Sequence, residues 1–409
     1  MLNQQVKTPG VYREDVFLTP SRGLRTGVPA FLGYATPRNA AQAIIEANAP
    51  QRLTRWPQFE EFFGPPLSDG YLGHAVRGFF ENEAQLCYVV RLDAAAGAVL
   101  ALRDGLQALE ALDTIDLVCA PDIMRPRPHP SEPQRWLPPD PSAVHLMQSA
   151  ILDHCATLGD RFALLDSLPC ADVETVLRQR QGLQSADGAL YYPWVRRLFS
   201  PGALNAPDCP AIADGFIPPC GHVAGIVAQT DQRIGVHKAP ANVSLQGVSD
   251  LEVSLSNVQQ DRLNPVGINC LRAFPGRGLR VWGARTLSLD PAWTYINVRR
   301  LFLTVGRWIE RNLAGAVFEP NDIRLWARVN RELTTYLGRL FQQGALLGRT
   351  EEEAFYVKCD AETNPPEVRD AGQLVTEIGL APALPNEFIV VRITHSASGV
   401  TLAGATETV

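Results

Sequence analysis

Between residues 100 and 190 the chain alternates between amphipathic segments and short apolar segments, and this order is the strongest constraint on its fold. Two segments have the composition of buried strands, namely Thr114–Ala120 and Phe162–Leu168. Three segments are expected to be helical, namely Arg103–Leu112, Ser142–Leu158 and Ala171–Arg180. Helices between strands at this spacing are typical of βαβ units, so the sequence predicts an α/β fold with parallel strands.

Further elements are expected on both sides of this block. Strands are predicted over Gly27–Ala35, Gln85–Leu92 and Leu279–Leu287, and long amphipathic helices over Tyr295–Leu313 and Asn321–Gln343. The buried stripe of the second helix should consist of Ile323, Trp326, Val329, Leu333, Tyr336, Leu337 and Leu340. Isolated strand-like segments lie near the two ends, at Val11–Phe17 and Glu387–Thr394. The small, polar residues after Ser396 are expected to be mobile.

Composition excludes several classes of protein. Of the 409 residues, 46% are hydrophobic and 20% are charged, which is typical of a chain with a sizeable globular core. The net charge of −6 argues against a nucleic-acid partner. The longest apolar run, Ala94–Leu102, is too short to span a bilayer, and the N-terminus lacks the apolar core of a signal peptide, so no membrane insertion is expected. Eight scattered cysteines without a C-x-x-C pair are expected to be reduced, as in an intracellular protein.

The sequence contains few signs of an active site. It has no phosphate-binding G-x-x-x-x-G-K-[ST] loop, no G-x-G-x-x-G, no H-E-x-x-H and no G-x-S-x-G. The best enzymatic candidates are Asp122 and Asp166, which follow or end two predicted buried strands, where ligands bind in open α/β sheets. Two carboxylates there could perform acid–base or metal chemistry. The favoured interpretation is that both are turn and cap residues.

Neither a metal site nor a cofactor site is predicted. The one metal-like cluster, Cys209, Cys220 and His222, lacks the closely paired ligands of a zinc site. Incidental thiols in a proline-rich loop are the simpler interpretation.

Two features point to interfaces. Arg324, Arg328, Arg331 and Arg339 fall on one strip of the predicted helix Asn321–Gln343, which is either a solvated face or a surface that docks an acidic protein. The two isolated terminal strands need partners for their backbone groups. They pair either within the chain or, by β-augmentation, with a neighbouring subunit.

Several stretches resemble the contractile tail sheath family of phage tails, R-type pyocins and extracellular contractile injection systems. They are TPGVYREDV (Thr8–Val16), GVPAFLGYA (Gly27–Ala35), GVHKAPAN (Gly235–Asn242), NPVGINCLRAFPGRGLRVWGARTL (Asn264–Leu287), YINVRRL (Tyr295–Leu301), AVFEPND…LW (Ala316–Trp326) and GALLGRTEEEAFYVKCD (Gly344–Asp360). The resemblance covers roughly residues 6–90 and 224–395 and is less clear from 95 to 223.

The resemblance implies a mixed α/β structural protein of several domains, not an enzyme. It implies an N-terminal exchange arm (1–25), a conserved core (26–94), a variable outer domain (95–223), a conserved C-terminal core (224–385) and a C-terminal strand and arm (386–409). It also implies assembly in the bacterial cytoplasm into a phage tail or an extracellular contractile particle.

The same resemblance implies partners and interface residues. Subunits would stack as six-subunit rings around an inner tube protein, with baseplate and terminal cap proteins at the ends. The exchanged strands would contain Val11, Tyr12, Val16, Phe17, Phe388, Ile389, Val390 and Val391. The tube-facing helix would present Arg324, Arg328, Arg331 and Arg339. Contraction would release packing energy stored in the extended sheath and would need no nucleotide.

Overall fold

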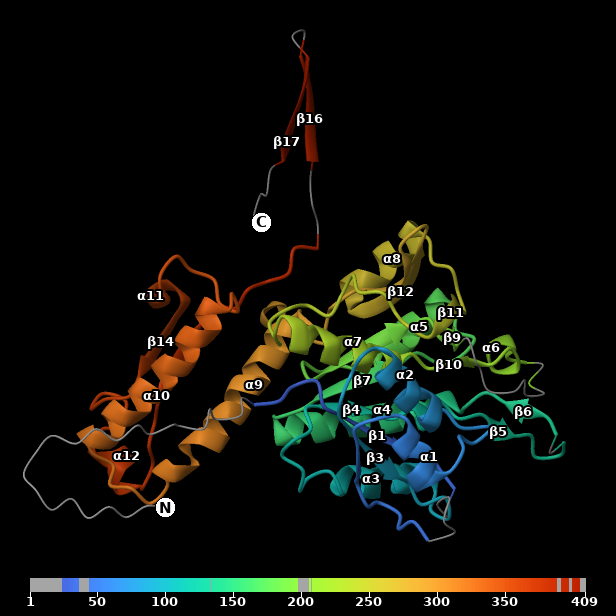
Figure 1. The fold of residues 1–409 in the computed structure, drawn as a ribbon, viewed down its shortest axis with the longest axis horizontal. Coiled ribbons are helices and arrows are strands. Elements are labelled where there is room, and N and C mark those ends of the chain that lie inside the picture. Colours follow the sequence, from blue (N-terminus) through green and yellow to red (C-terminus); the bar gives the residue numbers. More distant parts are fainter. Residues whose placement is uncertain are drawn as a thin grey trace, which may run out of the picture.

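An eight-stranded sheet forms the centre of the structure, a computed structural model that describes residues 24–36, 44–132, 134–197, 206, 208–387, 391–396 and 399–404 (Figure 1). The strand order is β13-β12-β8-β7-β4-β1-β3-β2. The bounds are β1 (Pro29–Gly33), β2 (Gln51–Leu53), β3 (Cys87–Arg91), β4 (Leu117–Cys119), β7 (Phe162–Asp166), β8 (Gly188–Tyr192), β12 (Ile268–Phe274) and β13 (Gly278–Trp282).

The six inner strands of this sheet, from β12 to β3, are parallel, and β13 and β2 are antiparallel edge strands. All residues of β1, β7 and β8 are buried. Continuous burial is what a parallel sheet covered on both faces requires, and it explains why these strands read as unbroken apolar runs. The predicted α/β fold with parallel strands is confirmed.

Helices cover both faces of the sheet. Their bounds are α1 (Pro57–Phe63), α2 (Leu72–Glu81), α3 (Ala98–Gln107), α4 (Pro141–Leu158), α5 (Val173–Gln181), α6 (Pro210–Ala213), α7 (Cys220–Arg233) and α8 (Asn257–Leu263). The crossovers through α3 and α4 run in the same direction, so right-handedness places them on one face, where they pack together. The pair α2 and α7 contacts β1, β4 and β7. The helix predicted over Arg103–Leu112 instead begins at Ala98, directly after Gly97.

Helix α7 escaped prediction because it has no polar face. Eleven of its residues are buried, so the chain shows no helical periodicity there. Its backbone lies against α2 so closely that a Cβ on Gly221 would be 2.2 Å from the carbonyl oxygen of Ala75. The boundary expected between residues 223 and 224 falls inside this helix. Strands from all three segments expected as separate domains, 26–94, 95–223 and 224–385, pair in the one central sheet.

The described residues also form four smaller sheets and four 3₁₀ helices. The sheets are β10-β9-β11, β5-β6, β14-β15 and β16-β17. The strand bounds are β5 (Arg127–Pro128), β6 (Trp136–Leu137), β9 (Val195–Arg197), β10 (Phe216–Ile217), β11 (Val248–Leu251), β14 (Phe355–Lys358), β15 (Glu377–Leu380), β16 (Val391–Ser396) and β17 (Gly399–Gly404). The 3₁₀ helices are η1 (Pro121–Met124), η2 (Asn264–Val266), η3 (Pro291–Trp293) and η4 (Ala314–Ala316).

Two long antiparallel helices form a separate lobe beside the sheet (Figure 1). They are α9 (Ile296–Leu313) and α10 (Ile323–Gln342), and the short helices α11 (Glu351–Ala354) and α12 (Pro366–Asp370) accompany them. Trp308 of α9 stacks on Tyr336 of α10, with ring centroids 4.1 Å apart. Both long helices are confirmed, with one correction to the buried stripe. Ile323 is 74% exposed, and Leu325, which is 5% exposed, packs in the core instead.

The hairpin of β16 and β17 stands away from the rest of the described chain (Figure 1). The strand predicted over Glu387–Thr394 overlaps β16, which is described from Val391 on, and residues 388–390 lie outside the described part. Within the segment expected to be mobile, Gly399–Gly404 pair with β16. Both strands of this hairpin contain β-branched residues, which favour strand structure. The predicted strand Val11–Phe17 also lies outside the described residues.

A buried arginine joins the α9–α10 lobe to the sheet. Arg300 of α9 places Nη2 2.8 Å from Oδ2 of Asp116 and 2.6 Å from Oδ2 of Asp231. Asp231 lies near the end of α7, and Asp116 also accepts the backbone N–H groups of Gly27 and Val28. The two carboxylates raise the pKa of Arg300 against the effect of burial. One guanidinium therefore connects α9, α7 and the residues that precede β1 and β4.

We predict that Arg300→Leu lowers the free energy of unfolding by about 3–5 kcal/mol, because it leaves two buried carboxylates without a counter-charge. Chemical denaturation of the two proteins measures the difference. Arg311→Leu, an exposed change on the same helix, is the control and should cost less than about 0.5 kcal/mol. Equal stability of the Arg300 variant and the wild type would contradict the role given to this ion pair.

Candidate functional site

The two predicted carboxylates lie at the same edge of the central sheet. Asp122 follows β4 within η1, and Asp166 ends the adjacent strand β7. Both side chains are buried. The sequence therefore placed these residues correctly at the carboxyl ends of parallel strands, and their partners decide whether they could meet a substrate.

Asp122 is fully engaged by backbone donors. Its Oδ2 accepts the N–H of Tyr34 at 2.6 Å, and its Oδ1 accepts the N–H groups of Tyr71 at 2.5 Å and Leu72 at 3.1 Å. Tyr71 and Leu72 begin α2, so this carboxylate caps a helix that is distant in sequence. Burial raises the pKa of Asp122, although the hydrogen bonds and Arg125 oppose the shift.

Asp166 performs the same task for α7. Its Oδ1 accepts the backbone N–H of Cys220, the first residue of that helix, at 2.8 Å. Burial raises the pKa of Asp166 to about 7, while hydrogen bonds from Cys220 oppose the shift. Sequence reasoning could not name the donor, because Cys220 is 54 residues away.

The edge of the sheet that would hold a ligand in many α/β enzymes is thus occupied by the N-termini of α2 and α7. Neither aspartate lines the 420 Å³ cavity beside Cys170 or the 240 Å³ cavity beside Arg307. A catalytic carboxylate needs contact with a substrate. The interpretation of Asp122 and Asp166 as cap residues is confirmed by these contacts.

Cys209, Cys220 and His222 are not brought together as a metal site. Cys209 forms a disulfide with Cys170, Cys220 lies beside Asp166, and the His222 ring packs against Gly78. Within the described ranges, no group of three or more His, Cys, Asp or Glu side chains could hold a metal ion. The expectation that all cysteines are reduced is wrong for Cys170 and Cys209, because folding brings the turn after β7 to the start of α6.

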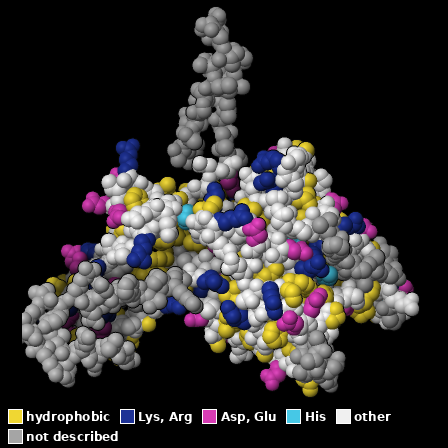
Figure 2. Space-filling model, viewed as in Figure 1, with side chains coloured by type: hydrophobic (Ala, Val, Ile, Leu, Met, Phe, Trp, Pro, Cys, Tyr) yellow, Lys and Arg dark blue, Asp and Glu magenta, His cyan; other side chains and the backbone are white. Residues whose placement is uncertain are grey.

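The remaining candidate sites are surfaces. On α10, Arg324, Arg331 and Arg339 are exposed. Arg328 is half-buried and paired, with Nη1 2.7 Å from Oε1 of Glu319 and Nε 3.8 Å from Glu332. The strip therefore contributes three exposed charges and one neutralised charge. On the face drawn in Figure 2, basic and acidic side chains are interspersed over the described surface.

Most residues of the predicted exchange strands lie outside the described part of the chain. Val11, Tyr12, Val16, Phe17, Phe388, Ile389 and Val390 lie outside the described residues, and Val391 begins β16. Among the described residues, β14 and β15 form a two-stranded sheet, with pairs from Phe355↔Leu380 to Lys358↔Glu377. Neither strand pairs with another strand among those that the structure describes.

Known proteins similar to this chain are tail sheath proteins. Two family profiles match it, "Phage tail sheath protein central domain" over residues 138–287 and "Phage tail sheath C-terminal domain" over residues 288–396. The tail sheath protein of Vibrio phage KVP40 is 32% identical over 178 residues, which are 42% of this chain and 26% of that protein. The chain thus spans about a quarter of the length of that curated relative.

Solved structures match over nearly the whole chain. A chain from the baseplate of the anti-feeding prophage is 32% identical with a TM-score of 0.73, and the match covers 95% of this chain and 99% of that one. The helical sheath of the anti-feeding prophage in its contracted state is 31% identical with a TM-score of 0.71, over 95% and 99% of the two chains. The two matched assemblies are thus a baseplate and a contracted helical sheath.

The matched profiles and the matched helical sheath are those of structural tail sheath proteins. The chain belongs to the contractile tail sheath family. It is not an enzyme. The block 95–223, where the motifs are less clear, is matched by the central-domain profile from residue 138. In the described part of the chain, no helix has the length and apolar character needed to cross a membrane.

We predict that the two isosteric changes at the closed sheet edge differ in their effect on the free energy of unfolding, with the larger loss at Asp122. Asp122→Asn should lower the free energy of unfolding by about 1–3 kcal/mol, because an amide nitrogen would face backbone N–H donors that now meet an oxygen. Asp166→Asn can keep its single cap bond through Oδ1. Denaturation at pH 8 compares the two variants. A larger loss for Asp166→Asn would contradict the cap assignment.

The pH dependence of Asp166→Asn provides a further check. The raised folded pKa means that the folded wild type holds this proton more tightly than the unfolded chain. The wild type therefore loses stability as pH rises from about 4 to about 7, and the asparagine variant lacks this loss. The stability of the variant relative to the wild type should increase across that range. If the stability difference between the variant and the wild type did not change with pH, the pKa of Asp166 would not be raised in the folded protein.

Proposed function

We propose that this chain is the repeating subunit of a contractile sheath that polymerises as stacked six-subunit rings around an inner tube. The observation that carries the proposal is the similarity, over nearly its whole length, to the contracted helical sheath of the anti-feeding prophage. Sheath contraction drives the tube into a target envelope. The particle is a phage tail or an extracellular contractile system assembled in the bacterial cytoplasm, with baseplate and cap proteins at its ends.

Strand exchange between subunits is the proposed means of polymerisation. The outer edges of β14 and β15 carry backbone N–H and C=O groups that no strand pairs with in the described part of the chain. The segments Val11–Phe17 and Glu387–Thr394 of neighbouring subunits have the strand pattern needed to add to such edges. An isolated hairpin such as β16–β17 is marginal in water, which supports a partner for it.

The tube is proposed to contact α10 in the extended state. Arg324, Arg331 and Arg339 point away from the apolar stripe that packs α10 on α9. Arginine suits such an interface because its planar fork binds carboxylates in a defined geometry. A tube surface that carries carboxylates would pair with these arginines and set the register of each ring. These pairs would break when the sheath contracts and releases the tube.

Contraction is proposed to be driven by stored packing energy. The sequence lacks a phosphate-binding loop, so no nucleotide step is invoked. The extended assembly is metastable, and the contracted one buries more surface. The ion pairs of Arg300 support a subunit that moves as a unit, because they hold the α10 lobe to the sheet.

Deleting residues 1–20 or residues 388–409 should abolish long assemblies and leave the subunit folded. The reason is that the hydrophobic core is built from residues between Val28 and Cys359. Negative-stain microscopy measures assembly, and circular dichroism measures folding. Deleting only residues 405–409, beyond β17, is the control and should leave assembly intact. Ordinary long sheaths from both large deletions would overturn the exchange hypothesis.

Replacing Arg324, Arg331 and Arg339 together by glutamate should yield only contracted, empty sheaths when the chain is co-expressed with its tube and baseplate. Exposed charge changes usually cost under about 1 kcal/mol each, so the subunit should still fold. Repulsion from the tube would be repeated in every ring of the extended state. Cryo-electron microscopy counts extended, tube-filled particles.

The control for this triple variant changes the same charge elsewhere. Arg103, Arg127 and Arg178 are exposed and lie on or near α3, β5 and α5, away from α10. Their replacement by glutamate should leave the fraction of extended particles unchanged. If both triple variants gave wild-type numbers of extended particles, the strip on α10 would be a solvated face.

A further inference from the structure

The disulfide between Cys170 and Cys209 joins the turn after β7 to the start of a segment that also packs in the hydrophobic core. Cys170 lies in the turn after β7, and Cys209 directly precedes α6. The segment 208–217, which contains α6 and β10, pairs with β9 through only two residues of β10. Its side-chain ion pairs are exposed, namely Asp208 with Arg135 and Asp214 with Arg196, while Ile212, Phe216 and Ile217 pack in the core. Apart from the backbone, the disulfide is the one covalent bond that attaches this segment to the rest of the described chain.

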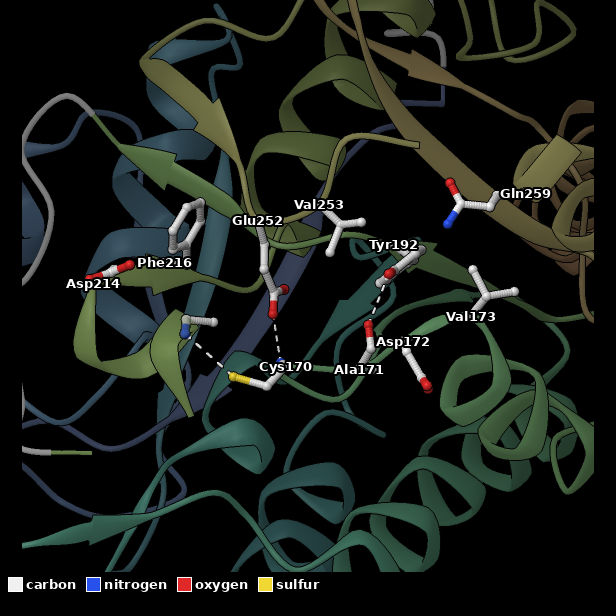
Figure 3. A pocket seen from close by; sticks show the side chains of 11 residues that line it. Cys170, Ala171, Asp172, Val173, Tyr192, Asp214, Phe216, Glu252, Val253 and Gln259 are labelled. Carbon is white, nitrogen blue, oxygen red and sulfur yellow. Dashed lines mark hydrogen bonds between the residues drawn. The ribbon is translucent and has the colours of Figure 1, made fainter. Parts of the chain in front are cut away.

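The two sulfur atoms differ in access. Cys170 is exposed and lines the 420 Å³ cavity (Figure 3). Cys209 is fully buried. A small reagent can therefore reach the sulfur of Cys170 through the cavity, while Cys209 can react only with Cys170. The six other cysteines are all buried and free. Exposure selects this pair as the redox-active one.

The backbone at Cys170 is held in an uncommon conformation. Its φ of 57° lies in the left-handed region, which a non-glycine residue adopts at a cost. Two contacts hold it there. The backbone N–H of Cys170 donates to Oε1 of Glu252 at 2.6 Å, and the N–H of Ala211 donates to its Sγ at 3.3 Å (Figure 3). A strained backbone conformation persists only where the surrounding contacts hold it. Here they hold Cys170 in the position that forms the disulfide with Cys209.

The cavity beside the disulfide is acidic. Its walls carry the carboxyl groups of Asp172, Asp214 and Glu252, and no basic side chain belongs to the described residues that line it. Burial raises the pKa of Glu252 to about 7, and Asp214 lies 3.8 Å from Arg196, so Asp172 and Asp214 supply most of the negative charge. A positively charged reagent should therefore accumulate at Cys170, and a negatively charged one should be repelled.

We propose that Cys170 and Cys209 form a reversible thiol–disulfide switch that fastens the segment 208–217 to the turn after β7. The oxidant is a small-molecule disulfide. The thiolate of Cys170 attacks one of its sulfur atoms, and the first small thiol leaves as a thiolate. The thiolate of Cys209 then attacks the sulfur of Cys170, and the second small thiol leaves. The two protons lost by the cysteines go to the two released thiolates, and an excess of thiol reverses both steps.

The first test counts thiols in the full-length protein under native conditions. Protein oxidised with cystamine, alkylated after denaturation and analysed by mass spectrometry should show six alkylated cysteines, and protein treated with excess thiol should show eight. At equal concentration and pH, the rate of reduction should fall in the order cysteamine, 2-mercaptoethanol, glutathione. Asp214→Asn should reduce the difference between the reduction rates with cysteamine and with glutathione. Eight alkylated cysteines after oxidation, or glutathione as the fastest reagent, would overturn the proposal.

The second test measures what the switch controls. Reduction should raise amide hydrogen exchange in residues 208–217 by about tenfold or more, because a cross-link restricts local opening. Re-oxidation should reverse the change, and exchange in β1 and β7 should not respond. Cys170→Ser, an exposed change, should behave like the reduced wild type in the presence and absence of oxidant. Equal exchange of the segment in oxidised and reduced wild type would show that the disulfide fastens nothing.

Discussion

The buried guanidinium of Arg300 is the interaction on which the rest of the structure depends. It joins α9 to α7 and to the residues that precede β1 and β4, and α9 in turn carries α10 and β14–β15. Burying three charges is costly, so packing alone would serve stability as well. What the ion pairs add is a fixed relation between the lobe and the sheet. A subunit that transmits force through a sheath needs such a joint, since a yielding lobe would absorb the motion.

The edge of the sheet where many α/β proteins bind ligands is closed here by the protein's own helices. Asp122 and Asp166 direct their carboxylates at the first N–H groups of α2 and α7, which pack closely on each other. Helix N-termini can bind anionic ligands because their first backbone N–H groups have no acceptor within the helix. In this protein those N–H groups are bonded to the protein's own carboxylates. The described residues at this edge of the sheet are thereby engaged in contacts within the protein itself.

Much of the fold was predictable from local pattern, and most of the site was not. Parallel strands such as β7 and amphipathic helices such as α9 carry a period or an apolar run that the sequence displays directly. Helix α7 is apolar on all sides, so its burial erased the signal. The partners of Asp122, Arg300 and Cys170 are distant in sequence, and nothing local marks them. The arginine strip was visible, but the pairing of Arg328 with Glu319 depends on how the η4–α10 connection folds.

Helical reconstruction by cryo-electron microscopy of the particles that the full-length chain forms tests the central claim most directly. The account predicts six subunits in each ring and a β14–β15 sheet extended on its free edges by strands from neighbouring subunits. It also predicts that α10 faces the lumen of the cylinder. Discrete compact particles in which β14–β15 remains two-stranded, or cylinders with α10 on the outer surface, would contradict it.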